Sequence, residues 1–566
     1  MKILLVAINA KYIHSNLAVY SLRAYTKDCE NTVKIANFTI NNLTEDIVRG
    51  IYEESPDVVA FSTYIWNVEY VKKVAWQIKQ VMPQAKIWLG GPEVSYETEN
   101  FMRKNPWADV LMLLEGEETF RELVENKIPH AYIKGIVYRN GEDIIKNPYR
   151  ETMDMDRLVF PYEDLGEFEN RIIYYESSRG CPFSCSYCLS SIEKSVRFKS
   201  LDIVKREIKF FIDNKVPQVK FVDRTFNCSH ARTKELWKFI TDNDNGITNF
   251  HFEISADLID DEEIELISHM REGLIQLEIG VQSTYEPTIK EIRRTMRLER
   301  LYEVVRHINT FGNTLLHLDL IAGLPYEGIE TFKKSFNDVY ALKPSELQLG
   351  FLKVLKGSYM HEKADEYGIK YTLAPPYEVL STRWLSYADI LILKRIEDVV
   401  ENYYNSGQYK HTVSYLETLF DTPYELYEAV SQYYTKNSLW GVNHSRTARY
   451  EILYDFGISV GADALVLSQL MTYDMYLRER LKKRPSFAKD ISPYKSEIRS
   501  LYDNEAAEFK DRLSHIEPVF ADVKTFEVLE EPCYILFDYE HKDRINNEAA
   551  IRKYELKPLK DTEKNE

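Results

Sequence analysis

The sequence predicts an α/β protein built from a doubly wound parallel sheet, a partial (β/α)6 barrel and a mainly helical C-terminal domain. Two stretches, 1–140 and 165–365, alternate short apolar segments with segments of helical periodicity, a pattern typical of parallel sheets covered by helices. Helical periodicity dominates over 370–566. A chain of 566 residues is also too long for one ordinary domain.

The first stretch predicts a Rossmann-like doubly wound sheet. Helical periodicity between the strand candidates, as over Val68–Val81, places helices on both faces. Sheets of this kind bind ligands at the carboxyl ends of their strands. The strand candidates are Leu4–Ile8, Val33–Ala36, Val58–Ser62, Ile87–Leu89 and Val110–Leu113.

Small and polar residues follow four of these strands, where a ligand would bind. Glycines allow a close backbone approach, and small hydroxyl groups can hydrogen-bond a ligand. We therefore expect a cofactor site at this edge. Its candidate residues are Ser62, Thr63, Gly90, Gly91 and Glu115.

The middle stretch predicts six parallel strands with crossover helices, which would form a partial barrel with its chemistry at the carboxyl ends of the strands. Polar residues alternate on two of these strands and so share one face: Glu253 and Ser255 on the third, Glu278 and Gln282 on the fourth. The strand candidates are Ile172–Glu176, Val219–Asp223, His251–Ser255, Gln276–Val281, Leu316–Ile321 and Leu347–Leu352.

Three cysteines directly follow the first of these strands, with the spacing Cys-x3-Cys-x2-Cys: Cys181, Cys185 and Cys188. Three thiolates on one short loop can hold three irons of a [4Fe–4S] cluster and leave the fourth iron open for chemistry. A structural zinc site would need a fourth ligand, and a disulfide framework suits short secreted chains. The other cysteines are scattered singly.

The run Ser178–Cys188 resembles the cluster loop of radical S-adenosylmethionine (radical SAM) enzymes, in which the open iron binds S-adenosylmethionine. Glu278–Ser283, Arg294 and Leu318–Pro325 are similar to later segments of that superfamily. The resemblance implies that Glu253, Ser255, Glu278, Gln282 and Arg294 contact S-adenosylmethionine. The alternative is an internal salt-bridge network with Arg293 or Arg294. The usual Gly-Gly-Glu after the second strand is absent, and Asp223–Asn227 stands there instead.

Residues 1–140 resemble the cobalamin-binding domains fused to such enzymes, through Ser62-Thr63, Gly90-Gly91-Pro92 and Glu115-Gly116-Glu117. The resemblance implies a cobalamin at the sheet edge. The Asp-x-His-x-x-Gly motif of mutase-type domains is missing, so no axial histidine is indicated, and His14 is the one nearby candidate. The rival hypothesis is a degenerate flavodoxin-like domain without a ligand.

The last stretch resembles a C-terminal domain of unknown function found in one subfamily of cobalamin-binding radical SAM proteins. It either closes the barrel mouth or serves packing and dimerisation. Residues from Glu540 onward are charged and expected to be mobile. Helices are expected over Leu380–Leu393, Tyr424–Lys436, Thr447–Gly457 and Val460–Arg478, and a strand over Cys533–Phe537.

Bulk properties narrow the functional classes. A net charge of −17 argues against a nucleic-acid-binding surface. No apolar run reaches the roughly 20 residues of a membrane span, and the N-terminus lacks a signal-peptide core. Free thiols without an export signal indicate the reducing cytoplasm.

The resemblance implies an enzyme in which a [4Fe–4S] cluster cleaves S-adenosylmethionine to a 5′-deoxyadenosyl radical, with cobalamin, for methylation of an unactivated carbon. Two alternatives remain: a cobalamin-assisted radical rearrangement or cyclisation, and a non-catalytic iron–sulfur electron-transfer protein. The implied partners are a small-molecule or peptide substrate and an electron donor such as flavodoxin or ferredoxin.

The cysteine triad generates a first prediction. Anaerobically purified protein should be brown and contain about four irons per chain, the number that a [4Fe–4S] cluster needs. Alanine at Cys181, Cys185 and Cys188 should abolish the colour, whereas alanine at Cys29, Cys228 and Cys533 should not. Elemental analysis of the anaerobic protein decides the matter, and zinc in place of iron would end the radical hypothesis.

Overall fold

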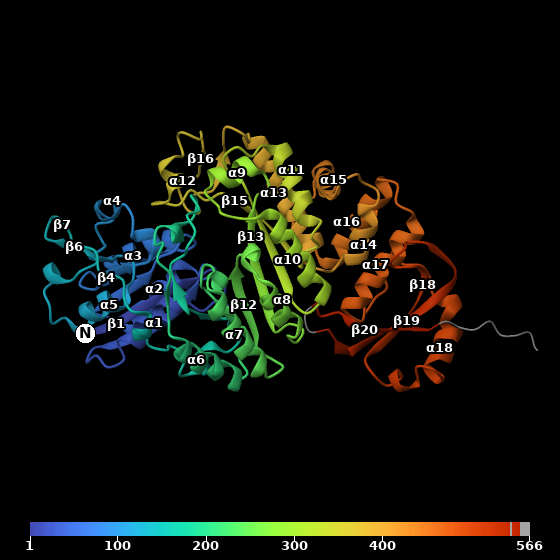
Figure 1. The fold of residues 1–566 in the computed structure, drawn as a ribbon, viewed down its shortest axis with the longest axis horizontal. Coiled ribbons are helices and arrows are strands. Elements are labelled where there is room, and N and C mark those ends of the chain that lie inside the picture. The colour runs from blue at the N-terminus through green and yellow to red at the C-terminus, as the bar shows by residue number, and fades with distance from the viewer. Residues whose placement is uncertain (544–545, 555–566) are drawn as a thin grey trace, which may run out of the picture.

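The computed structural model describes residues 1–543 and 546–554. Figure 1 shows three parts in a row along the long axis: an N-terminal α/β domain, a central strand-and-helix barrel, and a C-terminal part of helices with a small sheet. The three predicted parts are thus present in the predicted order. None of the described helices combines the length and apolar character needed to cross a membrane.

The N-terminal domain is a seven-stranded sheet of order β2-β1-β3-β4-β5-β6-β7, in which β1 to β5 are parallel. The strands are β1 (Lys2–Asn9), β2 (Thr32–Thr39), β3 (Val58–Ser62), β4 (Lys86–Gly90), β5 (Val110–Met112), β6 (Ile136–Asn140) and β7 (Asp143–Lys146). The helices are α1 (Leu17–Tyr25), α2 (Thr44–Glu54), α3 (Val68–Val81), α4 (Thr98–Lys104) and α5 (Glu117–Glu125).

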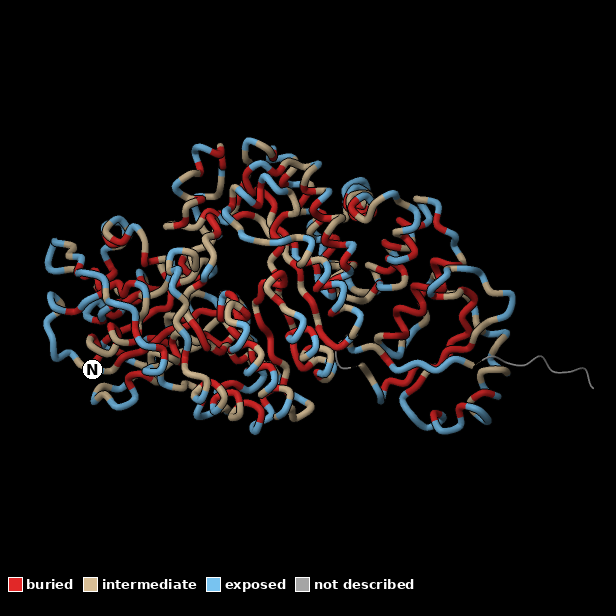
Figure 2. The backbone as a smooth tube through the Cα atoms, viewed as in Figure 1, coloured by how far each residue is buried: buried red, intermediate tan, exposed pale blue. Residues whose placement is uncertain are grey.

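Strand β1 explains why this sheet is doubly wound. Its alternate residues are buried in two different apolar clusters: Ile3 and Leu5 in one, Leu4 and Val6 in the other. Both faces of a central parallel strand must therefore be covered by helices. Figure 2 shows the resulting buried sheet interior. The antiparallel hairpin β6–β7 was not predicted, because its strands are short and their apolar runs, Ile136–Tyr138 and Ile144–Ile145, are interrupted by polar residues.

The barrel is an open sheet of six parallel strands in consecutive order, as predicted. They are β8 (Ile173–Tyr175), β11 (Gln218–Phe221), β12 (Asn249–Ile254), β13 (Ile275–Gln282), β14 (Leu315–Ala322) and β15 (Glu346–Phe351). The helices are α6 (Leu201–Asp213), α7 (His230–Asp242), α8 (Asp261–Ser268), α9 (Glu286–Glu291), α10 (Leu298–Phe311) and α11 (Ile329–Tyr340).

The N-terminal domain contacts both outer edges of this open sheet. Beside β8, the Ile172 amide donates to the Ile13 carbonyl at 2.8 Å. Beyond β15, the Tyr377 hydroxyl donates to Glu93 at 2.7 Å, just after β4. The strand-end loops of the first sheet therefore face the gap that the six strands leave open.

The C-terminal part is mainly helical, as predicted, with a three-stranded antiparallel sheet at its end. The chain enters it through α12 (Tyr359–Glu362) and the short pair β16 (Lys370–Tyr371) and β17 (Val379–Ser381). The helices are α13 (Tyr387–Val400), α14 (Lys410–Glu417), α15 (Pro423–Lys436), α16 (Arg446–Ser459), α17 (Ala464–Arg478) and α18 (Lys495–Asp503); the strands are β18 (Ser514–Ala521), β19 (Val528–Lys542) and β20 (Ala549–Tyr554).

Two expectations for this part were wrong. The helix predicted over Leu380–Leu393 begins only at Tyr387, because Ser386 caps it and Val379–Ser381 pairs as a strand. Residues from Glu540 were expected to be mobile, yet β19 continues to Lys542 and β20 reaches Tyr554. Strand pairing holds these charged residues in place. The remainder of the expected mobile tail, 555–566, lies outside the described residues.

Candidate active site

The cysteine triad lies on a loop between two short antiparallel strands at the end of β8. Strand β9 (Ser178–Arg179) leads into the loop and β10 (Arg197–Phe198) leads out. The thiols of Cys181 and Cys185 are buried, and that of Cys188 is partly buried. Gly180 has φ +90°, and a Cβ there would lie 2.3 Å from the Ser195 carbonyl oxygen, so only glycine allows this tight return of the chain.

The spacing of the thiols does not match a single zinc ion. Thiolates around one tetrahedral zinc lie about 3.8 Å apart, given Zn–S bonds of about 2.3 Å. In the part of the chain that the structure describes, the three triad sulfurs do not all lie within 4.8 Å of one another. A fourth thiol, Cys228, lies nearby, but burial, Asp223 and Cys181 raise its pKa to about 11.

Asp223 occupies the region where the Gly-Gly-Glu motif is missing, and it anchors the triad loop. Its buried carboxylate accepts hydrogen bonds from the Ser177 amide at 3.0 Å, from the Ser177 hydroxyl at 2.7 Å and from the Ser178 hydroxyl. Thr225 Oγ1 lies 3.5 Å from Cys181 Sγ. The segment after β11, which carries Asp223 and Thr225, therefore fixes the position of the triad loop.

Buried polar atoms without partners converge around Gly280. A Cβ at Gly280 would lie 2.1 Å from Gln282 Nε2 and 3.5 Å from Arg294 Nη2, so glycine keeps this space open to both side chains. Gln282 Oε1, Arg294 Nε and one carboxylate oxygen of Asp319 are buried and have no hydrogen-bond partner among the residues that the structure describes. Such atoms are rare in folded proteins and point to an absent ligand or water.

Arg294 connects this region to the cysteines. Its Nη1 lies 3.8 Å from Cys185 Sγ and 3.4 Å from the Tyr187 hydroxyl, and its Nη2 donates to the Gly280 carbonyl. Burial raises the pKa of the Cys185 thiol, while the Arg294 charge acts in the opposite direction. The predicted contact residues Gln282 and Arg294 thus lie together beside the triad.

Asp319 was missed as a site residue by the sequence analysis, although it stands within the segment Leu318–Pro325. It pairs in register with Gly280 across β13 and β14. Burial, followed by the charges of Glu278 and Glu253, raises its pKa to about 7. The signal that could have found it is an acid in the middle of an otherwise apolar strand.

The remaining predicted contact residues already have protein partners. Glu278 accepts hydrogen bonds from Lys220 and His251, each at 2.9 Å, and its pKa is lowered to about 2 despite burial. An internal ion-pair network therefore exists, with Lys220 in place of Arg293 or Arg294. Glu253 faces Arg224 at 3.8 Å, and burial raises its pKa. Ser255 donates to Asp257 at 2.7 Å.

The predicted residues at the edge of the first sheet also have protein partners. Ser62 accepts from Asn16 at 2.8 Å, and Thr63 donates to the Gly90 carbonyl at 2.8 Å. Gly91 has φ +117°, and its Cβ would lie 2.4 Å from the Thr63 carbonyl oxygen. These predicted residues shape the edge through bonds among themselves, and a bulky residue at position 91 would strike the protein backbone.

Two stacked aromatic rings, of which one is exposed, lie just beyond this edge. Tyr64 and Trp66 stack with ring centroids 4.4 Å apart and planes 5° from parallel, and Trp66 is 42% exposed. His14 Nδ1 lies 2.7 Å from the Tyr174 hydroxyl in the barrel wall, and burial lowers its pKa. Flat apolar faces at a strand-end edge suit a large planar ligand.

Glu115 is an ion-pair residue at the interface between the first domain and the barrel. It bonds Arg197 and accepts from the Met153 amide at 2.9 Å. Its neighbour Glu117 bonds Arg179, two residues before Cys181, and this charge keeps the Glu117 pKa low despite burial. The predicted cofactor edge thus reaches the triad loop directly.

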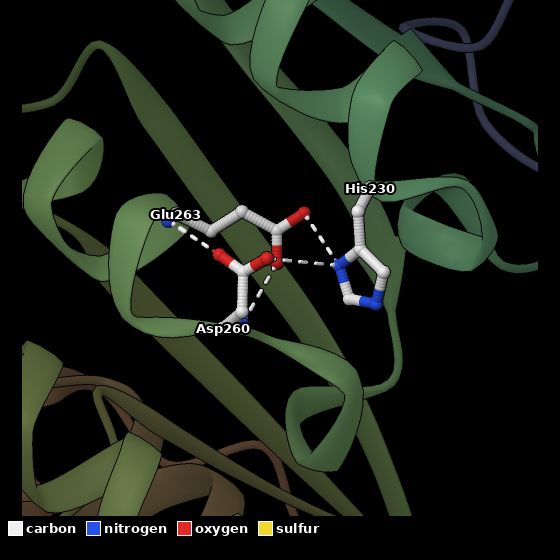
Figure 3. A group of neighbouring side chains, drawn as sticks. All are labelled: His230, Asp260 and Glu263. Carbon is white, nitrogen blue, oxygen red and sulfur yellow. Dashed lines mark hydrogen bonds and ion pairs between the residues drawn. The ribbon is translucent and has the colours of Figure 1, made fainter.

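A second group of potential metal ligands, His230, Asp260 and Glu263, has another explanation (Figure 3). Asp260 and Glu263 form the capping box at the start of α8, with hydrogen bonds of 2.9 and 3.0 Å. Lys234 Nζ also lies 2.7 Å from Asp260, so a positive charge already occupies this place.

Comparisons with known proteins match the three parts separately. Family models match for the B12 binding domain at residues 3–124, the radical SAM superfamily at 175–339 and the protein of unknown function DUF4080 at 365–553. The cobalamin-dependent radical SAM methyltransferase TokK of Streptomyces tokunonensis is 26% identical over 58% of this chain and 51% of its own.

A second sequence relative is the 2-(S-pantetheinyl)-carbapenam-3-carboxylate methyltransferase of Streptantibioticus cattleyicolor, 26% identical over 51% of this chain and 45% of its own. The chain therefore spans about half the length of these relatives. Among solved structures, the cobalamin-dependent S-adenosylmethionine radical enzyme OxsB matches with TM-score 0.58 at 15% identity, over 84% of this chain and 78% of its own. TsrM from Kitasatospora setae matches with TM-score 0.55 at 17% identity, over 67% and 82%. These likenesses establish the fold.

The raised pKa of Asp319 predicts a pH-dependent stability. An acid whose pKa is raised by folding stabilises the protein below its unfolded pKa, and this contribution is lost as pH rises toward the folded pKa of about 7. Asp319→Asn should therefore gain melting temperature over the wild type more at pH 8 than at pH 5.

Thermal melting of the cofactor-free protein at the two pH values measures this. Asp28→Asn is the control, because the hydrogen bond from Arg121 lowers the Asp28 pKa and its contribution therefore stays constant between pH 5 and pH 8. An Asp319→Asn difference that does not change with pH would show that Asp319 ionises normally.

Proposed function

This chain belongs to the radical SAM superfamily and carries a B12 binding domain before the barrel and a DUF4080 domain after it; from this premise we propose that it is a cobalamin-dependent radical SAM methyltransferase. It would act on an unactivated carbon of a small molecule or peptide. The observation that carries the proposal is the group of unpartnered buried polar atoms around Gly280, directly beside the cysteine triad.

The residues present fit the three cofactors. Cys181, Cys185 and Cys188 would hold a [4Fe–4S] cluster. Gln282, Arg294 and Asp319 offer an acceptor, a guanidinium and a carboxyl group to S-adenosylmethionine, whose carboxylate and hydroxyls can complete their hydrogen bonds. Glu253, Ser255 and Glu278 would border this site.

Cobalamin would lie on the carboxyl edge of the first sheet, along Ser62, Thr63, Gly90, Gly91 and Glu115. Gly90 and Gly91 are partly exposed at this edge, and the stacked Tyr64 and Trp66 offer an apolar face. When bound, the cluster with S-adenosylmethionine supplies a 5′-deoxyadenosyl radical, and cobalamin supplies a methyl group.

The protein's own contribution would be binding, orientation and exclusion of water. Arg294 would orient the methionine carboxylate beside Cys185, because its fork can bond both oxygens. The first domain would cover the open side of the barrel, so that a radical formed inside is shielded from solvent. An electron donor such as flavodoxin or ferredoxin in the cytoplasm would complete the system.

Two other functions use the same cofactors or part of them. Cobalamin could assist a radical rearrangement or cyclisation, which the same site would accommodate. A non-catalytic electron-transfer protein would normally use four cysteines for its cluster and has no use for the polar atoms around Gly280. Methyl transfer therefore remains our proposal.

The proposed function predicts that the anaerobically reconstituted, reduced protein converts S-adenosylmethionine to methionine and 5′-deoxyadenosine, detected by chromatography. Arg294→Lys keeps the charge but loses the fork, so affinity for S-adenosylmethionine and the yield should fall by roughly tenfold or more. The control is Arg271→Lys, whose guanidinium forms a forked pair with Asp244 at 2.7 and 3.2 Å, before β12 and β13 and so at the opposite end of the barrel strands from the triad.

Unchanged affinity together with a lowered melting temperature in Arg294→Lys would make Arg294 a structural residue. No 5′-deoxyadenosine from the wild type with any reductant would refute the radical function itself.

We also predict that cobalamin binds without a histidine ligand from the protein. The segment 1–128 contains one histidine, His14, and it is engaged with Tyr174. The cob(II)alamin EPR spectrum should be identical in protein labelled with 15N-histidine and in unlabelled protein, and His14→Ala should bind cobalamin as the wild type does. A nitrogen coupling that changes with the label would contradict this prediction.

A further inference from the structure

A buried ion-pair cluster of Arg179, Arg197, Glu115 and Glu117 joins the first domain to the triad loop. We propose that Arg179 is a positioning residue that couples the occupancy of the cobalamin site to the geometry of the triad. This inference rests on the proposed function, because it requires both a cobalamin site and a cluster site.

All three nitrogens of the Arg179 guanidinium bond carboxylates. Its Nη2 and Nη1 bond the two oxygens of Glu117 at 2.6 and 3.3 Å, and its Nε donates to Glu176 at 3.0 Å. The side chains of Arg179 and Glu117 are 14% and 6% exposed. A two-pronged pair in such a desolvated place has a fixed geometry, unlike a single surface contact.

Arg197 completes the ion-pair cluster. Arg179 and Arg197 are direct partners across β9 and β10, where like charges repel each other. Glu115 offsets this repulsion: its Oε1 bonds Arg197 and lies 3.5 Å from Arg179 Nη1. Arg197 also donates to the Met153 carbonyl at 2.6 Å. Neither arginine can move without the carboxylates of the first domain.

Short, stiff connections lead from this cluster to the first cysteine. Cys181 is two residues from Arg179, and a Cβ on the intervening Gly180 would lie 2.3 Å from the Ser195 carbonyl oxygen, so the chain passes close to Ser195. The Cys181 amide donates to the Glu193 carbonyl at 3.1 Å, and the Glu193 side chain accepts from Arg197 Nε at 3.0 Å. A shift of either arginine would therefore move the Cys181 backbone.

The opposite side of the cluster lies at the proposed cobalamin edge. Glu117 is the first residue of α5, after the short turn that follows β5, and the helix N-terminus favours its negative charge. A ligand seated on this edge would contact the turn that carries Glu115 and Glu117. Ligand-induced ordering of the turn would thus be passed to the triad loop through Arg179.

Two coupled sites must influence each other equally at equilibrium. The test compares the dissociation constant of hydroxocobalamin, from equilibrium titration, between two forms of the full chain. One form carries its reconstituted cluster, and in the other Cys181, Cys185 and Cys188 are all changed to alanine. The chain with the cluster should bind cobalamin more tightly, by about 5- to 150-fold, the usual range of coupling between sites.

The same ratio is then measured in Arg179→Lys, which keeps the charge but loses the fork, and in Glu117→Gln, which keeps the shape but loses the charge. Both should bring the ratio close to one while cobalamin still binds. The matched control is Arg23→Lys. Arg23 also forms a forked pair between the first domain and the segment before the barrel, with Glu167 at 3.0 and 3.1 Å, but far from the triad loop in sequence. Its ratio should stay at the wild-type value.

A wild-type ratio of one, or variants that keep the wild-type ratio, would overturn this inference and leave the proposed function standing. Failure of the wild type to bind cobalamin would overturn the proposed function and this inference with it. Thermal melts report the folding of each variant, and Glu117→Gln alone decides if Arg179→Lys does not fold.

Discussion

A parallel sheet of six strands that curves without closing leaves one side open, and the rest of this structure depends on how that side is covered. The first domain covers it with its strand-end loops, through Ile13 beside β8 and Glu93 beyond β15. The edge at which a Rossmann-like sheet binds ligands is thereby turned toward the barrel interior. The two cofactor sites that we propose would therefore lie next to each other.

The interior of the barrel is polar. A barrel interior that serves only as a hydrophobic core is filled with apolar side chains. Lys220, His251 and Glu278 satisfy one another there, so this part needs no ligand. Gln282, Arg294 and Asp319 leave atoms unsatisfied. These unpartnered atoms lie beside Cys185, where we propose that S-adenosylmethionine binds.

Much of this could be predicted from the sequence, because strands buried on both faces and a cysteine triad are local patterns. The ion-pair partners of Arg179 could not, since Glu117 is 62 residues away and only the packing of the two domains brings them together. Gly91 was interpreted as room for a ligand, whereas its φ of +117° and the Thr63 backbone already require glycine. The antiparallel pairing of β6 with β5, and of β18 with β19 and β20, depends on contacts between strands, which periodicity does not reveal.

The C-terminal domain takes part in the same enclosure through its first residues. Val379 of β17 packs on Gly323, where φ is +93° and a Cβ would lie 2.8 Å from the valine side chain. The Val379 amide donates to the Leu352 carbonyl, just after β15. Tyr377 bonds Glu93 of the first domain. The segment that begins the DUF4080 match thus joins barrel and first domain at one point. This favours a role in closing the barrel side over a role in dimerisation alone, because a separate packing domain would have no reason to contribute to this junction.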